Sequence, residues 1–249
     1  MTTKVSMSSE PFADGAMRYA FYMRDIVDDQ DQVAKIPKKI SKRTYTQNHM
    51  KKEIETTIFC SYIVNDFNDR IILQQDQTVI TEFVDAFIYE FTDPDVEFKW
   101  AYGENFINGI YQKYNNNAGW ASEQSSLQVK IAQTLSHFSW QLTQGYLLIS
   151  DLQGVGNILT DPQIHCVDQE RFGSGNLGLY GILLYFDTHI CNEFCKKLNL
   201  IHPREVKKLP ENFDIFGNLD FSKITHTSSH KAARKKVTKL CELCKKAHQ

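Results

Sequence analysis

Two carboxylates and an amide follow a short apolar run near the middle of the 249-residue chain. The run begins at Leu147, is typical of a buried strand, and ends at Asp151 and Gln153. Because side chains two apart on a strand point to the same side, we expect these two to converge on a hard cation such as Mg²⁺. A second carboxylate, Asp161, follows in a Thr-Asp-Pro turn. One acid that holds metal and another that accepts a hydroxyl proton suit phosphoryl transfer.

A histidine and two cysteines, His189, Cys191 and Cys195, form a second pattern, typical of a metal site. Cysteines four apart share a helical face, as paired thiolate ligands must. His189 lies about 200° from Cys191 on an ideal helix, so it joins them only if the helix is distorted there or begins after it. A tetrahedral site needs a fourth ligand, and His137 or His165 would supply it from a distance. The alternative is that the cysteines pack in a core, and that His137 is a core histidine.

A rival set of ligands stands near the end of the chain, at Cys241, Cys244 and His248. The spacing of the two cysteines is tight, but three ligands are again too few.

Residues 173–178 match the pattern G-x-G-x-x-G, which alone is weak evidence. The pattern falls late in the chain, where neither a dinucleotide-binding fold nor an ordinary protein kinase places it. The tripeptides H-R-D and D-F-G of ordinary kinases do not occur. The loop is therefore expected to shape the wall of a cleft or a peptide groove.

The polar residues after the apolar run, and a lysine elsewhere in the chain, also have plain structural explanations. A strand that ends in a polar turn accounts for Asp151 and Gln153, and composition alone favours that interpretation. Lys35 lies in a short apolar strand predicted over residues 33–36. Its ammonium either reaches outward to water or meets an anion, and for a lysine taken alone the first is commoner.

The elements that must position these residues mix strands and helices. The patterns predict strands over 16–24, 33–36 and 97–104, helices over 46–66, 122–142 and 179–200, and either type over 81–91. We expect residues 1–14 to be a flexible lead-in and residues 203–249 to form a tail. The tail ends in a basic run from Lys231, which is typical of a solvated helix face or of a site for acidic partners.

Composition is ordinary for a globular protein, and the net charge of −2 indicates no general attraction to nucleic acid or anionic membrane. No apolar run reaches the roughly 18 residues of a membrane span, and the start shows no signal-peptide core. We therefore expect a cytosolic protein, in which the clustered members of the six cysteines are metal ligands or thiols.

Six motifs in order give the chain a specific resemblance to a known family. They are residues 113–117 (KYNNN), 135–138 (LSHF), 151–156 (DLQGVG), 159–165 (LTDPQIH), 172–178 (FGSGNLG) and 189–195 (HICNEFC). Over about 15–200 the sequence resembles the atypical alpha-kinases. The resemblance implies a two-lobed α+β kinase fold with a structural zinc site in the C-terminal lobe, and a catalytic domain over 15–202.

The resemblance also implies roles for the residues that carry chemistry. Lys35 matches the strand lysine that grips the ATP phosphates, which overturns the outward-pointing interpretation. Asp151 and Gln153 match magnesium ligands, and Asp161 matches the acid that orients or deprotonates the substrate hydroxyl. The remaining matches are Arg18 near the phosphates, Glu104 on the adenine side, Lys113 at the nucleotide, Gly173, Gly175, Asn176 and Gly178 in the glycine-rich loop, and His137, His189, Cys191 and Cys195 as zinc ligands. Asn108 departs from the family, because some members have Glu there.

The expected function is thus transfer of the ATP γ-phosphoryl group to Ser or Thr of a protein, with Mg²⁺ and Zn²⁺ as cofactors. The alternatives are a pseudokinase scaffold that binds ATP without transferring it and a zinc-dependent interaction module. A metal-dependent hydrolase is a weaker third, because no H-x-H or H-E-x-x-H pair occurs. The oligomeric state cannot be predicted from these residues.

Overall fold

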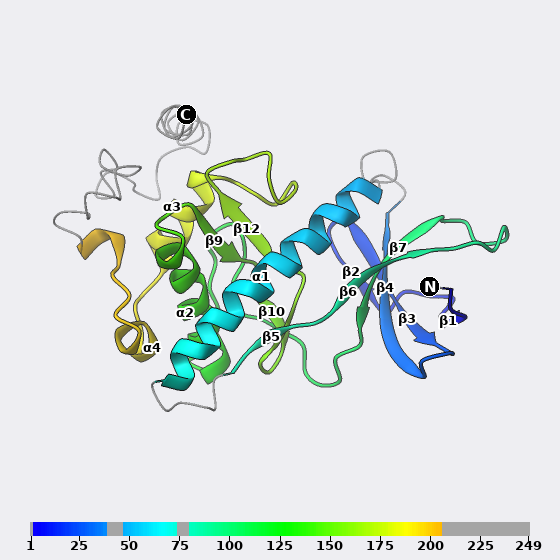
Figure 1. Cartoon of the computed structure of the whole chain (residues 1–249), viewed down its shortest axis with the longest axis horizontal. Coiled ribbons are helices and arrows are strands. Elements are labelled where there is room, and N and C mark those ends of the chain that lie inside the picture. Colours follow the sequence, from blue (N-terminus) through cyan, green and yellow to red (C-terminus); the bar gives the residue numbers. More distant parts are fainter. Residues whose placement is uncertain (1, 39–46, 74–79, 206–249) are drawn as a thin grey trace.

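The computed structural model describes residues 2–38, 47–73 and 80–205. The chain first builds an antiparallel sheet of six strands in the order β1-β3-β4-β7-β6, with β2 paired to β3. These strands are β1 (Val5–Met7), β2 (Ala13–Asp14), β3 (Arg18–Asp25), β4 (Gln30–Pro37), β6 (Ala86–Glu90) and β7 (Trp100–Asn105). We call this sheet the N-terminal lobe (Figure 1).

The register of the sheet decides which side chains share a face. Ala20 of β3, Lys35 of β4 and Tyr102 of β7 lie opposite one another across the three strands. Arg18 and Glu104 are each two residues from a member of this row, so they project from the same face. The other face carries a small apolar core around Met23, Ala34, Ile36 and Ala101.

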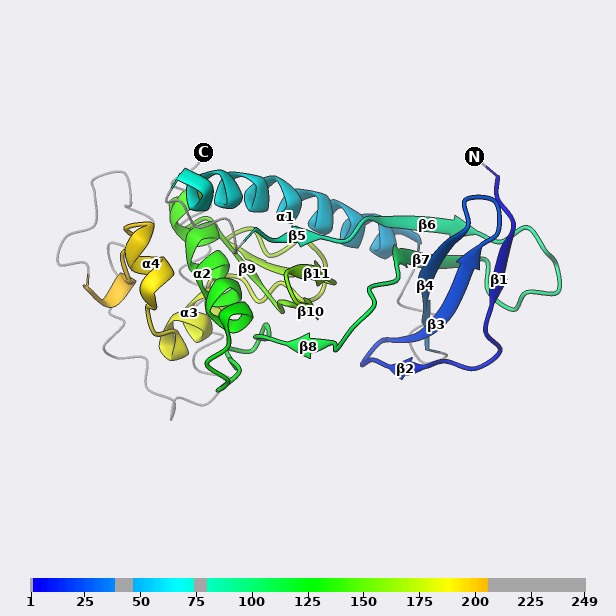
Figure 2. The same cartoon turned by 90° about the horizontal axis from the view of Figure 1, so that it is seen from below.

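Helix α1 (Gln47–Leu73) runs from the N-terminal lobe along the rest of the molecule (Figures 1 and 2). It contacts β6 and β5, and further along it contacts α2. Its buried residues recur near helical spacing from Met50 to Ile71, which gives the helix one apolar stripe.

The C-terminal lobe is formed by residues 112–205 together with strand β5 (Glu82–Phe83) from earlier in the chain. It contains a four-stranded sheet in the order β5-β11-β10-β8 and the antiparallel pair β9 and β12. The elements are β5 (Glu82–Phe83), β8 (Gln112–Lys113), β9 (Leu147–Ser150), β10 (Gln153–Val155), β11 (Ile158–Thr160), β12 (Gln163–Cys166), α2 (Leu127–Leu142), α3 (Leu179–Thr188), α4 (Glu193–Lys197) and a 3₁₀ turn (Pro203–Glu205). The largest apolar core joins α1, α2, β9 and β12.

The predicted strands over 16–24, 33–36 and 97–104 are confirmed as β3, β4 and β7 in their main parts, and 81–91 proves to be two strands. The helix predicted from residue 46 continues to Leu73, beyond the predicted end at 66. The helix predicted from residue 122 begins only at Leu127, because the hydroxyl of Ser126 caps it by accepting from the Val129 amide at 3.3 Å.

Two predictions are wrong. The single helix over 179–200 is broken, because α3 ends at Thr188 and α4 begins only at Glu193, where the Asn192 side chain accepts from the amides of Phe194 and Cys195. Residues 1–14 are not simply a flexible lead-in, because β1 and β2 pair with β3.

The tail predictions fall mostly outside the described residues. The basic run from Lys231 and the rival ligands Cys241, Cys244 and His248 all lie outside the residues that the structure describes. In the part that the structure does describe, none of the helices combines the length and apolar character needed to cross a membrane.

Candidate functional site

Lys35 projects from β4 into a group of opposite charges that joins the two lobes. Its ammonium Nζ lies 2.8 Å from Oε1 of Glu104 on β7 and 3.5 Å from Oδ2 of Asp161, which follows β11. The hydroxyl of Thr160 donates to Oε2 of Glu104 at 2.6 Å. The lysine side chain is only 11% exposed, so these contacts are largely shielded from water. Lys35 therefore meets carboxylates inside the protein and does not reach outward to water, while its contact with ATP phosphates stays a prediction.

Arg18 brings a second cation to the same acid. One guanidinium nitrogen, Nη2, donates to both oxygens of Asp161 at 2.6 and 2.9 Å, and Nη1 donates to Oε2 of Glu53 on α1 at 2.8 Å. The ring of Tyr102 lies beneath both cations, 5.2 Å from Cζ of Arg18 and 5.5 Å from Nζ of Lys35. We call Arg18, Lys35, Glu53, Glu104 and Asp161 the charged cluster.

Two cations fix the ionisation of Asp161. Burial alone would raise the pKa of its carboxyl, but the charges of Arg18 and Lys35 outweigh burial and hold this pKa well below its usual value. The carboxylate is therefore ionised at neutral pH, while the side chain keeps 26% exposure.

The second acid, Asp151, stands beside this cluster. Burial raises the pKa of its carboxyl, and the ammonium of Lys113, 2.8 Å from Oδ1, opposes that rise. The charge of Asp161 also contributes to the raised pKa, and the Gln153 side chain hydrogen-bonds the Asp151 carboxyl. The structure thus brings Asp151, Gln153 and Lys113 together next to Asp161.

The geometric reason predicted for the convergence of Asp151 and Gln153 is wrong. β9 ends at Ser150 and β10 begins at Gln153, so Asp151 and Gln153 do not alternate along one strand. Asp151 instead has a φ of +56°, in the left-handed region that residues other than glycine seldom adopt. The two side chains meet because the backbone turns sharply between the strands.

The side-chain amide of Asn176 is bonded on every side to backbone groups. Its Oδ1 accepts from the amides of Cys166 and Gly178, both at 2.8 Å, and its Nδ2 donates to the carbonyls of Asp168 and Arg171 at 2.9 and 3.0 Å. All four hydrogen-bonding positions of the amide are thereby used, and they hold the loop of residues 173–178 against β12 and the segment that follows it. Contact of Asn176 with the nucleotide, expected with the rest of the glycine-rich loop, stays a prediction.

The glycines of the loop meet the β12 side of the site. A Cβ on Gly175 would lie 1.7 Å from Oε1 of Gln163, two residues beyond Asp161. Gly173 and Gly178 have φ values of +82° and +64°. The side-chain amide of Asn117 donates to the Gly175 carbonyl at 3.3 Å. The loop therefore borders Asp161 through Gln163.

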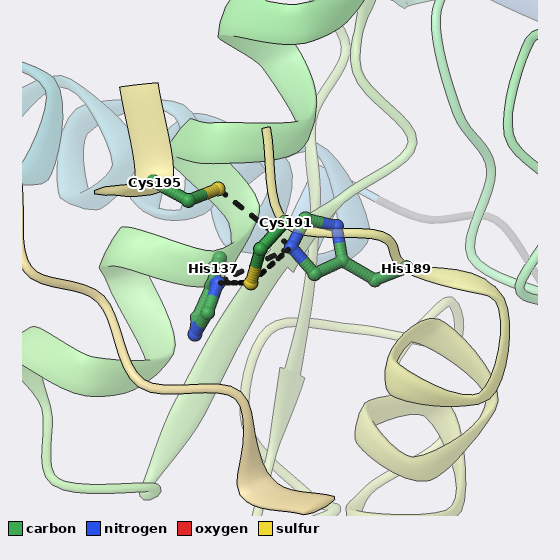
Figure 3. Close-up of side chains that lie close together, drawn as sticks. All are labelled: His137, His189, Cys191 and Cys195. Atoms are coloured by element: carbon green, nitrogen blue, oxygen red, sulfur yellow. Dashed lines mark hydrogen bonds between the residues drawn. The ribbon is translucent and has the colours of Figure 1, made fainter. Parts of the chain in front are cut away.

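Four predicted ligands converge at one place in the C-terminal lobe (Figure 3). We call His137, His189, Cys191 and Cys195 the metal cluster, because their ligand atoms all lie within 4.8 Å of one another. Nδ1 of His137 is 3.2 Å from Nε2 of His189, and Sγ of Cys191 lies 3.7 and 3.8 Å from these two nitrogens. Sγ of Cys195 is 3.8 Å from Nε2 of His189. His165, the other candidate, lies elsewhere and bonds Ser150.

The break between α3 and α4 makes this convergence possible. His189 follows the last residue of α3 and has extended backbone, and Cys195 lies in the first turn of α4. The condition stated for His189, that the helix be interrupted before Cys191, is therefore met. His137 comes from α2, so the cluster ties two segments of the lobe together.

Hydrogen bonds on the far side of each imidazole fix its tautomer. Nε2 of His137 is 3.1 Å from the Ile201 carbonyl, which can only accept. Nδ1 of His189 is 2.9 Å from the hydroxyl of Tyr185, which donates to the Gln133 carbonyl at 2.5 Å. Burial lowers the pKa of His137 to about 4 and that of His189 to about 3, so each ring carries one proton at neutral pH. Both nitrogens that face the cluster therefore present lone pairs.

A family model for alpha-kinases matches residues 13–195 of this chain. The chain belongs to the alpha-kinase family. Among curated relatives, alpha-protein kinase 1 of Dictyostelium discoideum is 35% identical over 198 residues, which cover 80% of this chain and 14% of that protein. Myosin heavy chain kinase C of the same organism is 36% identical over 205 residues, 82% of this chain and 25% of the relative.

This alpha-kinase sequence spans between 14% and 32% of the length of four such relatives. Human eukaryotic elongation factor 2 kinase is 38% identical over 114 residues, 44% of this chain and 15% of that kinase. The solved alpha-kinase domain of myosin heavy chain kinase A in complex with ADP is 25% identical, with a TM-score of 0.70 over 81% of this chain and 90% of that one. The AMP-PNP complex of the same domain has a TM-score of 0.71 at 24% identity, covering 80% and 88%. The mixed α/β atypical kinase fold is thereby confirmed.

Three residues of the alpha-kinase site were missed at the sequence level. Thr160 stands beside Asp161 in the same short motif, which was a usable signal. Glu53 and Tyr102 had none, because each lies on an ordinary element and meets Arg18 only when α1, β3 and β7 come together.

Proposed function

We propose that this alpha-kinase domain transfers the γ-phosphoryl group of ATP to Ser or Thr of a protein. The observation that carries the proposal is the meeting of Lys35 from the N-terminal lobe with Asp161 from the C-terminal lobe at 3.5 Å. A strand lysine paired with an acid from the opposite lobe can supply the charge neutralisation and the positioning that phosphoryl transfer requires. The nucleotide complexes of the solved relative support ATP as the donor.

Arg18 and Lys35 are the cations that would receive the phosphates. In the ligand-free structure both are paired to carboxylates, which keeps two nearly buried charges in place and oriented. Phosphate oxygens would replace some of these carboxylate partners, and the fold would stay the same. Glu104 holds Lys35 in the present arrangement, and its contact with the adenine side of the nucleotide stays a prediction. Lys113, whose side chain is 45% exposed, would contact the nucleotide from the C-terminal lobe.

Asp151 and Gln153 have the hard oxygen donors that suit magnesium, and their side chains already touch. When bound, the ion would neutralise phosphate charge. The raised pKa of Asp151 indicates a carboxyl that lacks enough positive charge nearby, which is consistent with a cation site.

Asp161 would orient the hydroxyl of the substrate. Its low pKa makes it a weak base while Arg18 and Lys35 face it. As those cations turn toward phosphate, the basicity of the carboxylate would rise and it would be able to accept the hydroxyl proton. The loop of residues 173–178 borders this acid through Gln163 and would form the protein-substrate side of the site.

We further propose that the metal cluster holds a structural zinc ion. Two neutral imidazoles that present lone pairs to each other at 3.2 Å repel unless a cation lies between them. Tetrahedral zinc predicts about 3.3 Å between two ligand nitrogens and about 3.6 Å between nitrogen and sulfur, close to the 3.2, 3.7 and 3.8 Å found here. Zinc would tie α2 to the segment between α3 and α4.

The catalytic unit is proposed to span 15–202, close to the family match of 13–195. A cytosolic location and the absence of nucleic-acid binding stay predictions from composition.

The test is incubation of the purified chain with γ-labelled ATP and Mg²⁺, alone and with a helical test protein, followed by mapping of the modified residues. We expect label on Ser or Thr only. Nucleotide binding without any transfer would identify a pseudokinase scaffold, and no nucleotide binding at all would favour a zinc-dependent interaction module.

A further inference from the structure

Asn115 lies in the asparagine-rich run that follows Lys113. Its side chain is buried, with 1% exposure, and its Oδ1 accepts from the backbone N–H of Leu152 at 2.8 Å. Leu152 is the residue between Asp151 and Gln153. The asparagine therefore bonds the middle of the turn that carries both proposed magnesium ligands.

The backbone of the same run holds the other side of that residue. The amides of Tyr114 and Asn115 both donate to the Leu152 carbonyl, at 2.9 and 3.2 Å. Both backbone polar groups of Leu152 are thus bonded to this run. The turn needs such support, because a non-glycine residue with the +56° φ of Asp151 is strained and persists only where its surroundings impose it.

The Asn115 amide is itself oriented by α2. Its Nδ2 donates to Oγ of Ser136 at 3.1 Å and to Oε1 of Gln133 at 3.4 Å, and both partners are nearly or fully buried. Because the NH₂ group faces these two acceptors, the oxygen is directed to Leu152. The backbone carbonyl of Gln133 in turn accepts from the hydroxyl of Tyr185, which also bonds the proposed zinc ligand His189. A continuous buried set of hydrogen bonds thereby joins the metal cluster to the Asp151 turn.

We propose that Asn115 is a positioning residue that holds Asp151 and Gln153 in the geometry that receives magnesium with the nucleotide. The proposal rests on the kinase function proposed above. Asn115 touches neither nucleotide nor metal in this account and acts only through Leu152. Its loss should weaken the part of nucleotide binding that depends on Mg²⁺ and leave the remainder intact, a split that general loss of packing would not produce.

The experiment compares Asn115→Ala, Asn115→Asp and the control Asn116→Ala. Asn116 is the neighbouring asparagine, and its Oδ1 accepts from the nearby backbone amides of Ala118 and Trp120. Affinity for ADP is measured by calorimetry with Mg²⁺ and in magnesium-free buffer, and thermal melting reports the fold. No chelator is added, so that the metal cluster is left undisturbed.

For Asn115→Ala we expect ADP affinity in Mg²⁺ to fall roughly 10- to 100-fold, as when a group that orients a metal ligand is removed. Affinity without Mg²⁺ should change by less than about twofold. Asn115→Asp keeps an acceptor for the Leu152 amide and should recover most of the loss. Asn116→Ala should match the unmodified chain in both buffers.

Unchanged magnesium-dependent affinity in a folded Asn115→Ala protein would overturn the positioning role. Equal weakening with and without Mg²⁺ in both Asn115 variants would also overturn it. Should Asn115→Ala fail to fold, Ser136→Ala is used in its place, because it removes only one of the two bonds that orient the Asn115 side chain. The proposal then requires Ser136→Ala to weaken ADP binding in Mg²⁺ more than in magnesium-free buffer, by a smaller factor. If the unmodified chain shows no magnesium-dependent binding of ADP, the proposed function fails first and this inference with it.

Discussion

The charged cluster and the metal cluster hold their side chains in opposite ways. The charged cluster gathers full charges from β3, β4, β7, α1 and the turn after β11, and its members share partners, since Asp161 contacts both Arg18 and Lys35. The metal cluster draws its ligands from α2 and one short segment, and its imidazoles are neutral. Charges that are balanced by one another can be re-paired with an incoming phosphate. Lone pairs that face each other in a buried site repel, and the proposed zinc ion would remove that repulsion.

This difference predicts that stability and activity are separable at the charged cluster and inseparable at the metal cluster. The charged cluster joins two lobes through ion pairs that a ligand can replace, so substitutions there should change chemistry more than folding. The metal cluster holds one lobe together, so substitutions there should remove both at once. The following predictions test that contrast.

The largest effect is expected from Cys195→Ser. Structural zinc contributes on the order of 10 kcal/mol to folding in small zinc-binding peptides, which is comparable to the whole stability of a typical domain. We expect the variant to be insoluble or unfolded and free of zinc, measured by soluble yield and by elemental analysis. Cys60→Ala is the matched control, since Cys60 is equally buried but lies on α1 outside the metal cluster. A soluble, active, zinc-free Cys195→Ser protein would refute the zinc assignment.

A smaller and divided effect is expected from Lys35→Met. The rate of phosphoryl transfer should fall at least about 100-fold, because a cation that neutralises the transferred charge is lost. The free energy of unfolding should also fall by about 3 kcal/mol, because Glu104 stays buried without its cation.

Adding Glu104→Gln to Lys35→Met should restore most of the stability and none of the activity. Chemical denaturation and a labelled-ATP assay on the same preparations measure the two quantities. Recovery of activity in the double variant would contradict the role given to Lys35, and no recovery of stability would show that the charged cluster is as indivisible as the metal cluster.

The smallest effect concerns His165, a buried histidine that belongs to neither cluster. Burial lowers its pKa to about 4, and its Nδ1 accepts from the Leu177 amide at 3.2 Å. The unfolded chain binds this proton near pH 6.5 and the folded chain only near pH 4, so stability is full above pH 6.5 and is lost as the pH falls toward 4. His165→Asn should remove up to about 3 kcal/mol of this pH dependence. The difference in unfolding free energy between the two proteins, followed from pH 7 to pH 4.5, measures it, and a constant difference would contradict the assignment.

Much of the charged cluster could be predicted from the sequence because its residues sit in short motifs with regular alternation. Lys35 and Asp161 were placed correctly on a strand and in a turn. The geometry around Asp151 was missed because a left-handed turn at a non-glycine residue leaves no signal in the pattern. The backbone hydrogen bonds of the Asn176 side chain gave no signal for a related reason, since they depend on where the chain folds back.

The metal cluster could be predicted only in part. Spacing brought Cys191 and Cys195 together, but it favoured one continuous helix where the structure has two. The cap at Asn192 decides the break, and an asparagine inside an amphipathic pattern predicts a cap no better than it predicts a helix interior. The choice of His137 over His165 came from family resemblance, because nothing in the local sequence distinguishes two buried histidines.

The most direct test of the account is phosphoryl transfer by Asp151→Ala. The variant should keep its zinc content and melt close to the unmodified chain, because Asp151 lies outside the metal cluster. Its autophosphorylation with labelled ATP and Mg²⁺ should fall at least about 1,000-fold. Autophosphorylation near the level of the unmodified chain, in a folded and zinc-loaded protein, would contradict the account.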